Sequence, residues 1–315
     1  VNGIEIYCEV HGSGEPLLLI EGLGYSSWMW YKQLPTLSDQ YQVIVFDNRG
    51  VGKTDKPEEA YSIEIMADDA AGLLKALGIE SAHILGVSMG GFIAQELALR
   101  HPEAVKSLIL VSTNMGSYNK PYVSPVFWGG FLKLWGFLPE ILQASGKASV
   151  PVSNYGLSRE EKIRYGLSLA LSRKYFDAHP DEVDKIVRWR MDNPQPNYAW
   201  RNQLQAGIKF DSSDRAHEIK APALVISGTE DRIIKPESAQ ELSRALEDSA
   251  FKPIEGAGHL LFIERSRKFN NTVLRFLDSH RDTAGDVLRG DTGEYSIWDR
   301  IASLFRSDKN LRTLN

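Results

Sequence analysis

The chain has 315 residues, 43% of them hydrophobic, and a formal net charge of −5 at pH 7. These values are typical of a globular protein with a large core, either one α/β domain with an insertion or two domains. No long basic run is present, so we do not expect nucleic acid as a partner. Cys8 is the single cysteine, which excludes an internal disulfide framework. Without a signal pattern at the start of the sequence, a cytoplasmic location is the expectation.

Short apolar runs alternate with helix-like segments through the first third of the chain. Residues 4–10 alternate polar and apolar side chains, as a half-exposed strand does. The later runs are continuously apolar, as in strands buried on both faces of a parallel sheet. We expect these strands at 17–20, 43–46, 82–87 and 105–112, and helices at 27–37, 63–77 and 91–99. This order predicts a parallel, doubly wound sheet with right-handed crossovers.

The alternation stops between about 115 and 216, where the sequence is helix-like and rich in tryptophan. It then resumes with strands expected at 223–227 and 251–254 and helices expected at 236–246 and 266–279. We interpret residues 1–115 and 217–280 as an α/β core and 116–216 as a helical cap inserted after the sixth strand. A cap there would cover the carboxyl edge of the sheet, where ligands bind in open α/β folds.

The C-terminal segment, residues 281–315, lies beyond the expected end of this core. Residues 283–293 are polar and glycine-bearing, like a linker. Beyond them, Ile297, Trp298 and Ile301 fall on one face of a predicted amphipathic helix. We expect this helix to dock on its own domain or on a second subunit. Peripheral membrane contact is the less favoured alternative.

The pentapeptide Gly86-Val87-Ser88-Met89-Gly90 has the form G-x-S-x-G and stands between a predicted strand and a predicted helix. In this context the pattern indicates a nucleophile elbow. The glycines allow strand and helix to approach closely, so that the serine hydroxyl stands exposed above the sheet. Ser88 is therefore a candidate nucleophile.

With this motif in place, the chain resembles the α/β-hydrolase superfamily over residues 1 to about 280. That family carries its nucleophile, acid and histidine in this order, each on a loop after a strand. Asp231 follows the strand ending at Ser227, and His259 follows the next strand. The resemblance implies Ser88 as nucleophile, His259 as general acid and base, and Asp231 as the orienting acid. Glu230 is the nearest alternative for the acid.

Acyl transfer also needs backbone donors for the developing oxyanion. The resemblance assigns them to the amides of Met89, directly after the nucleophile, and of Leu23, in the loop that follows the strand at 17–20. Here the chain departs from the family, because Glu21 stands where a histidine is usual. A carboxylate would oppose the oxyanion. We therefore expect Glu21 to point away or to meet a cation such as Arg49.

The predicted cap is the segment that we expect to select the substrate. Trp128 and Trp135, with Gly22 and Leu260 from the core, are the candidate substrate-binding residues. An aromatic cap favours an apolar acyl or alkyl group, so hydrolysis of small apolar carboxylic esters through an acyl-enzyme is the first hypothesis. Lactonase, C–C bond hydrolase and prolyl iminopeptidase activities remain alternatives on the same triad, as does a ligand receptor on a hydrolase scaffold. The resemblance implies neither a cofactor nor a metal.

Overall fold

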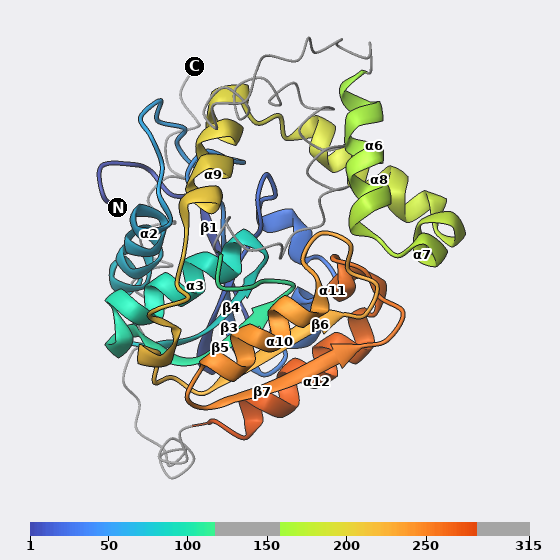
Figure 1. The fold of residues 1–315 in the computed structure, drawn as a ribbon. Coiled ribbons are helices and arrows are strands. Elements are labelled where there is room, and N and C mark those ends of the chain that lie inside the picture. Colours follow the sequence, from blue (N-terminus) through green and yellow to red (C-terminus); the bar gives the residue numbers. More distant parts are fainter. Residues whose placement is uncertain (117–157, 282–315) are drawn as a thin grey trace, which may run out of the picture. The chain divides into compact units, whose positions relative to one another are not determined.

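The computed structural model describes residues 1–116 and 158–281, and within them seven strands form one sheet (Figure 1). The strands are β1 Cys8–His11, β2 Glu15–Ile20, β3 Tyr41–Phe46, β4 Ala82–Val87, β5 Val105–Val111, β6 Ala223–Gly228 and β7 Ser249–Ile254. Their order across the sheet is β1-β3-β2-β4-β5-β6-β7. β1 runs antiparallel to β3 and all other neighbours are parallel. The predicted doubly wound, mostly parallel sheet is thus confirmed.

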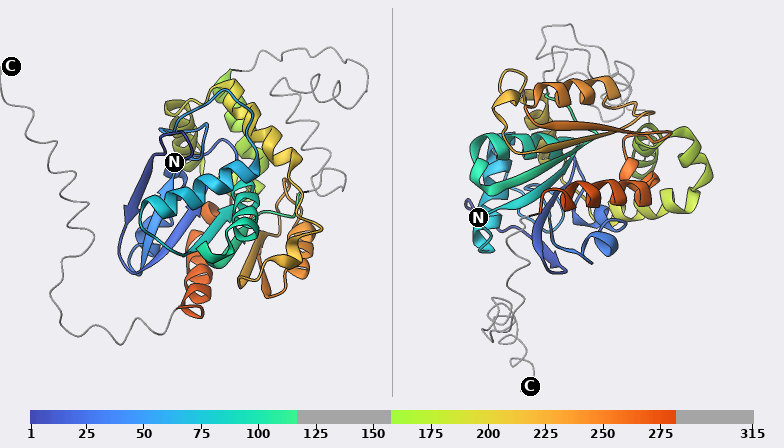
Figure 2. Two further views of the ribbon diagram at one scale, coloured as in Figure 1. Left: turned by 90° about the vertical axis from the view of Figure 1, so that its left-hand side faces the viewer. Right: turned by 90° about the horizontal axis from the view of Figure 1, so that it is seen from below.

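Helices cover both faces of this sheet because its central strands are apolar on both sides. Alternate residues of β2 show the division. Leu18 and Ile20 belong to the buried cluster that includes residues of α2, α3 and α10, whereas Leu17 and Leu19 belong to the cluster that includes residues of η1, α1 and α12. Figure 2 shows α2 and α3 on one side of the sheet and α12 on the other. The helices around the sheet are η1 Ser27–Trp30, α1 Leu34–Leu37, α2 Ile63–Ala76, α3 Met89–Arg100, η2 Pro102–Ala104, η3 Ala216–Glu218, α10 Pro236–Ala245, α11 Leu261–Glu264 and α12 Ser266–Asp278.

Two predicted elements near the N-terminus differ from the structure. The strand expected at 4–10 begins only at Cys8, because residues 1–7 form a turn and a loop. The helix expected at 27–37 is broken into η1 and α1, with Pro35 in the first turn of α1. Proline is accepted in a first turn, where its missing N–H is not needed, and it interrupts a continuous helix. Pro35 is therefore the residue in the sequence that indicates a break in this helix.

Between β5 and β6 the described residues are helical: α6 Arg159–Ala170, α7 Arg173–Ala178, α8 Pro180–Asp192 and α9 Asn197–Lys209. A bridge between Gly116 and Asp211 brings the two ends of this insertion together. The insertion follows the fifth strand, so the expected count of six strands before it is wrong. The five strands before it correspond to those expected at 4–10, 17–20, 43–46, 82–87 and 105–112. Trp128 and Trp135 fall in 117–157, outside the described residues.

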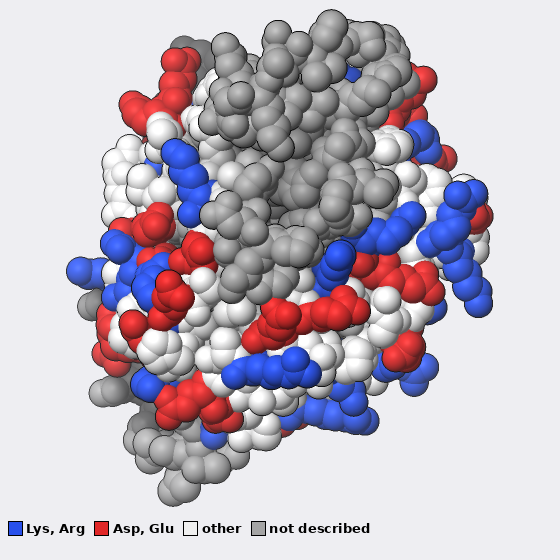
Figure 3. Space-filling view, viewed as in Figure 1, with Lys and Arg blue, Asp and Glu red and all other residues white. Residues whose placement is uncertain are grey.

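By its internal contacts the chain divides into Val1–His280 and Arg281–Asn315. The predicted C-terminal linker and amphipathic helix lie outside the described residues. In the part of the chain that the structure describes, no helix is both long and apolar enough to cross a bilayer. Acidic and basic side chains are interspersed on the face drawn in Figure 3.

The glycine at the end of β4 allows us to test how tightly this fold is packed. A Cβ at Gly86 would lie 2.2 Å from the carbonyl oxygen of Gly90, whereas a Cβ at Gly166 in α6 would meet nothing within 4 Å. We expect Gly86→Ala to lower the free energy of unfolding by at least about 2 kcal/mol. The matched control Gly166→Ala should raise it by about 0.5–1 kcal/mol, since alanine favours a helix. Urea unfolding measures both, and equal stability of the two variants would contradict the packing argument.

Candidate active site

Ser88 stands alone between the last residue of β4 and the first residue of α3. Its backbone has φ +55° and ψ −117°, a conformation that residues with a side chain rarely adopt. The turn is tight because α3 starts directly against β2: a Cβ at Gly90 would lie 2.2 Å from the carbonyl oxygen of Ile20. The motif thus forms the strained strand-to-helix turn that the sequence predicts. Strain of this kind is typical of a functional position.

His259 and Asp231 form a hydrogen-bonded pair on two neighbouring loops. Their side chains are joined from Nδ1 to Oδ2 at 2.8 Å, and both residues are buried. The other carboxylate oxygen, Oδ1, accepts the amides of Ile233 and Ile234 at 2.8 and 3.0 Å. Because a carboxylate only accepts, Nδ1 is the donor and Nε2 is left as the acceptor. Glu230, the alternative acid, is exposed.

The end of β5 ties the serine turn to the histidine loop. Ser88 donates its amide to the carbonyl of Val111 at 2.9 Å, and the hydroxyl of Thr113 donates to the carbonyl of Ser88 at 2.8 Å. The hydroxyl of Ser112 donates to the carbonyl of His259 at 2.9 Å. Ser88 Oγ and the His259 ring are not hydrogen-bonded to each other in the described structure. The contacts from the end of β5 therefore connect the two loops through the backbone.

Sequence reasoning missed Ser112 and Thr113. The available signal was their position: polar residues that directly follow a buried strand lie at the carboxyl edge of a parallel sheet. Ser88, Asp231 and His259 occupy the same kind of position.

Glu264 and α6 hold the histidine loop from the other side. One carboxylate oxygen of Glu264 accepts the amides of Gly258 and Ser172, and the other accepts the Ser172 hydroxyl at 2.5 Å. Leu260 donates its amide to the carbonyl of Ala170 at the end of α6. Its side chain is buried in the core cluster on the α12 face of the sheet. The helices of the insertion thus contribute directly to the position of His259.

The loop after β2 passes beside Ser88, as expected for an oxyanion loop. A Cβ at Gly22 would lie 3.3 Å from Ser88 Cβ and 3.9 Å from its hydroxyl oxygen. Leu23, the next residue, is half-buried. Met89 is the first residue of α3, and the amides of a first helical turn have no acceptor within the helix. The structure therefore brings Gly22 to the serine and leaves the Met89 amide available by its position.

Glu21 does not pair with Arg49, which corrects one of the two expectations. The Arg49 guanidinium binds Asp69 at 2.5 and 2.8 Å. Glu21 is completely buried, and its Oε1 accepts the amide of Asn48 at 2.5 Å. Its Oε2 has no hydrogen-bond partner among the described residues. Burial, followed by the nearby Asp47 carboxylate, raises the pKa of Glu21 well above its usual range, which favours the neutral acid.

Gln203 on α9 fixes the same loop from the side of the insertion. The amide of Gly24 donates to Gln203 Oε1 at 3.2 Å, and Gln203 Nε2 donates to the carbonyl of Arg49 at 2.8 Å. The side chain is buried, so both contacts are shielded from water. No pattern in the sequence distinguishes Gln203, because its partners are more than 150 residues away. Among the described residues, no cluster of three or more His, Cys, Asp or Glu side chains is arranged to hold a metal ion.

Comparisons with known proteins agree with this fold. The family model described as the alpha/beta hydrolase fold matches residues 15–266. One relative is a Mycobacterium tuberculosis protein with the name non-heme bromoperoxidase BpoC. It is 31% identical over 280 residues, which cover 88% of this chain and 98% of that protein.

Two solved structures are similar over nearly the same length. The enol-lactonase from Burkholderia xenovorans is 27% identical with a TM-score of 0.73, and the match covers 88% of this chain and 98% of the enzyme. A thermophilic esterase from Thermogutta terrifontis is 26% identical with a TM-score of 0.72, covering 89% of this chain and 95% of the esterase.

The burial of Glu21 predicts a pH dependence of stability. Above about pH 4.5 the unfolded chain loses the Glu21 proton while the folded protein keeps it, which lowers stability by up to about 1.4 kcal/mol per pH unit until the raised folded pKa is reached. Glu21→Gln removes this loss and retains an oxygen for the Asn48 amide. We expect the variant to become progressively more stable than the wild type from pH 5 to pH 8, as measured by urea unfolding at each pH. Glu80→Gln, the same change at an exposed position, is the matched control for the chemical substitution. A constant difference for Glu21→Gln would show that Glu21 is ionised in the fold.

Proposed function

This chain belongs to the alpha/beta hydrolase family, and we propose that it is a serine hydrolase that cleaves small carboxylic esters through an acyl-enzyme intermediate. The observation that carries this proposal is the buried His259–Asp231 pair, joined at 2.8 Å, together with the end of β5, which binds both the histidine loop and the serine turn. A strained serine at the start of a helix and a histidine whose ring is oriented by an acid are two of the features that nucleophilic catalysis requires, and both support the proposal.

The proposed reaction follows from the hydrogen-bond roles of the three side chains. Ser88 Oγ attacks the ester carbonyl carbon while its proton passes to His259 Nε2, since Nδ1 is held by Asp231. The imidazolium then gives this proton to the departing alcohol. In the second half, His259 takes a proton from the water that attacks the acyl carbon. The imidazolium then returns this proton to Ser88 Oγ as the bond between Oγ and the acyl carbon breaks, which releases the acid and restores the serine and the neutral histidine. Asp231 stabilises the positive charge on the ring in both halves.

We assign the oxyanion hole to the amides of Leu23 and Met89. Gly22 next to Ser88 and the start of α3 at Met89 support the assignment. The main objection to this assignment is that an ionised Glu21 would repel the oxyanion, and the raised pKa of Glu21 answers it. A neutral acid, with one oxygen engaged by the Asn48 amide, does not repel the developing oxyanion as a carboxylate would. The departure from the usual histidine is therefore compatible with acyl transfer.

Lactone opening is the second candidate, and the likeness to the Burkholderia xenovorans enol-lactonase favours it. The chemistry is the same, except that the alcohol remains attached to the acyl group after the ring opens. The esterase from Thermogutta terrifontis supports the first candidate to a similar degree. The expectation of a wholly apolar substrate rests on residues 117–157, outside the described part of the chain.

Substitution of the three side chains tests the proposal. With p-nitrophenyl acetate, we expect Ser88→Ala to lower kcat/KM by at least about 1,000-fold, because the nucleophile is lost. Asp231→Asn should cost about 100-fold or more through loss of the correct tautomer. The neighbouring Glu230→Gln should remain within about threefold of the wild type. Glu21→Gln should lower turnover less than Ser88→Ala does. Circular dichroism and thermal unfolding establish that each variant is folded.

Two results would contradict the proposal. A folded Ser88→Ala protein with full activity would refute the nucleophile. A wild-type protein with no multiple turnover of any ester or lactone would instead favour the alternative of a ligand receptor on a hydrolase scaffold.

A further inference from the structure

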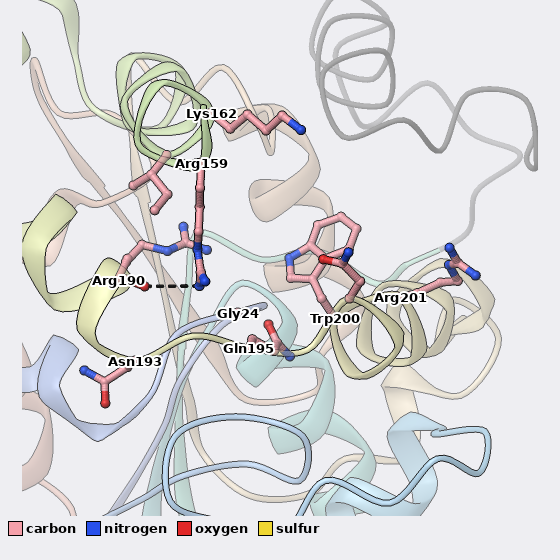
Figure 4. Close-up of a pocket in the computed structure, with 10 residues that line it drawn as sticks. Gly24, Arg159, Lys162, Arg190, Asn193, Gln195, Trp200 and Arg201 are labelled. Carbon is pink, nitrogen blue, oxygen red and sulfur yellow. Dashed lines mark hydrogen bonds between the residues drawn. The ribbon is translucent and has the colours of Figure 1, made fainter. Parts of the chain in front are cut away.

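A cavity of about 330 Å³ lies beside Gly24, where α6, α8 and α9 face the loop after β2 (Figure 4). Four cationic side chains line it: Arg159 and Lys162 from α6, Arg190 from α8 and Arg201 from α9. None of its ten lining residues is an aspartate or a glutamate. The charged side chains that line the cavity are thus all basic, whereas acidic and basic side chains are mixed on the face drawn in Figure 3.

Three of these cations lack an acidic partner within the described part of the chain. Arg159, Lys162 and Arg190 form no ion pair there, whereas Arg164 on the same helix as Arg159 binds both Glu160 and Asp184. Figure 4 shows Arg159 and Arg190 side by side, and Arg159 Nη2 donates to the carbonyl of Arg190 at 3.4 Å. Partial burial, followed by the charge of Arg190, lowers the pKa of Arg159. Like charges held together in this way favour the binding of an anion.

The cavity lies next to the proposed oxyanion loop. A Cβ at Gly24 would lie 3.2 Å from Arg190 Nη2 and 3.2 Å from the Trp200 ring, and a Cβ at Gly22 would lie 3.3 Å from Ser88 Cβ. Two residues of chain span at most about 7 Å. One short loop thus contacts the nucleophile at Gly22 and the guanidinium at Gly24. The segment between these two glycines is short on the scale of a small ester with a second functional group.

We propose that this cavity binds a carboxylate of the substrate, so that the substrate is a small ester or lactone that also carries a free carboxylate. The inference rests on the proposed function, since it takes Ser88 as the reacting group. Guanidinium groups are planar and bind carboxylates through two parallel hydrogen bonds, and Lys162 adds a third positive charge. The volume is at the small end for ligand sites, which favours a short molecule. Such a substrate carries an anionic end in addition to the apolar acyl or alkyl group that the sequence favours.

Two p-nitrophenyl esters that differ in charge test the inference. The monoester of glutaric acid carries a free carboxylate, and p-nitrophenyl methyl glutarate is its neutral counterpart. We expect the wild type to have the higher kcat/KM for the charged ester, with a preference that weakens as salt is added. Arg190→Gln should lower the ratio of the two kcat/KM values by about 10- to 100-fold, as loss of a charged hydrogen bond does. Arg188→Gln removes an exposed arginine of the same helix that does not line the cavity, and it should leave the ratio unchanged.

The outcomes separate this inference from the proposed function. Turnover of both esters with no preference for charge, or an unchanged ratio in Arg190→Gln, overturns the carboxylate site and leaves the hydrolase standing. If Arg190→Gln does not fold, Arg159→Gln takes its place. Absence of turnover with either ester overturns the proposed function, and the site is then measured without catalysis.

Calorimetry gives that independent measurement. Ser88→Ala protein should bind glutarate, and the double variant with Arg190→Gln should bind it at least about tenfold more weakly. Absence of glutarate binding overturns the inference. Equal binding of inorganic phosphate would also overturn it, because the cavity would then be a general anion site.

Discussion

The close approach of α3 to the ends of β2 and β4 is the constraint on which this molecule depends. Gly86 and Gly90 have no side chains, so the backbone of the first turn of α3 packs directly against two strands. That contact forces Ser88 into a positive φ and brings Gly22 within reach of its hydroxyl. The serine, the loop beside it and the start of the helix are thus set by one piece of backbone packing.

Further contacts hold this turn in register with the rest of the site. The end of β5 supplies Ser112 and Thr113, which bind the histidine loop and the serine turn. Gln203 on α9 binds the loop after β2 and the loop that carries Arg49. Both the carboxyl edge of the sheet and the inserted helices therefore position the loops of the candidate site. Deep burial of these polar groups makes their geometry costly to change.

Charge is distributed around the candidate site in two different ways. Glu21, buried next to the proposed oxyanion loop, is driven towards its neutral form because burial opposes ionisation and raises its pKa. Arg159 and Arg190, on the open side of the same loop, are cations without acidic partners among the described residues. A surrounding of this kind is unfavourable for a wholly apolar ligand and favourable for one with an anionic end.

The sequence by itself determined the features that depend on local chemistry. Each of these features depends on a few consecutive residues and was therefore predictable. They are the buried strands, the G-x-S-x-G turn at Ser88 and the loop positions of Asp231 and His259. The break before α1 was predictable too, since Pro35 signals it.

Only the tertiary structure decided the features that join distant residues. Arg49 has Asp69 rather than Glu21 as its partner, and Arg159 meets Arg190 across 31 residues. Side-chain pairing of this kind depends on which helix faces come together when the apolar surfaces are buried, and hydrophobic patterning fixes those faces without specifying the polar contacts between them.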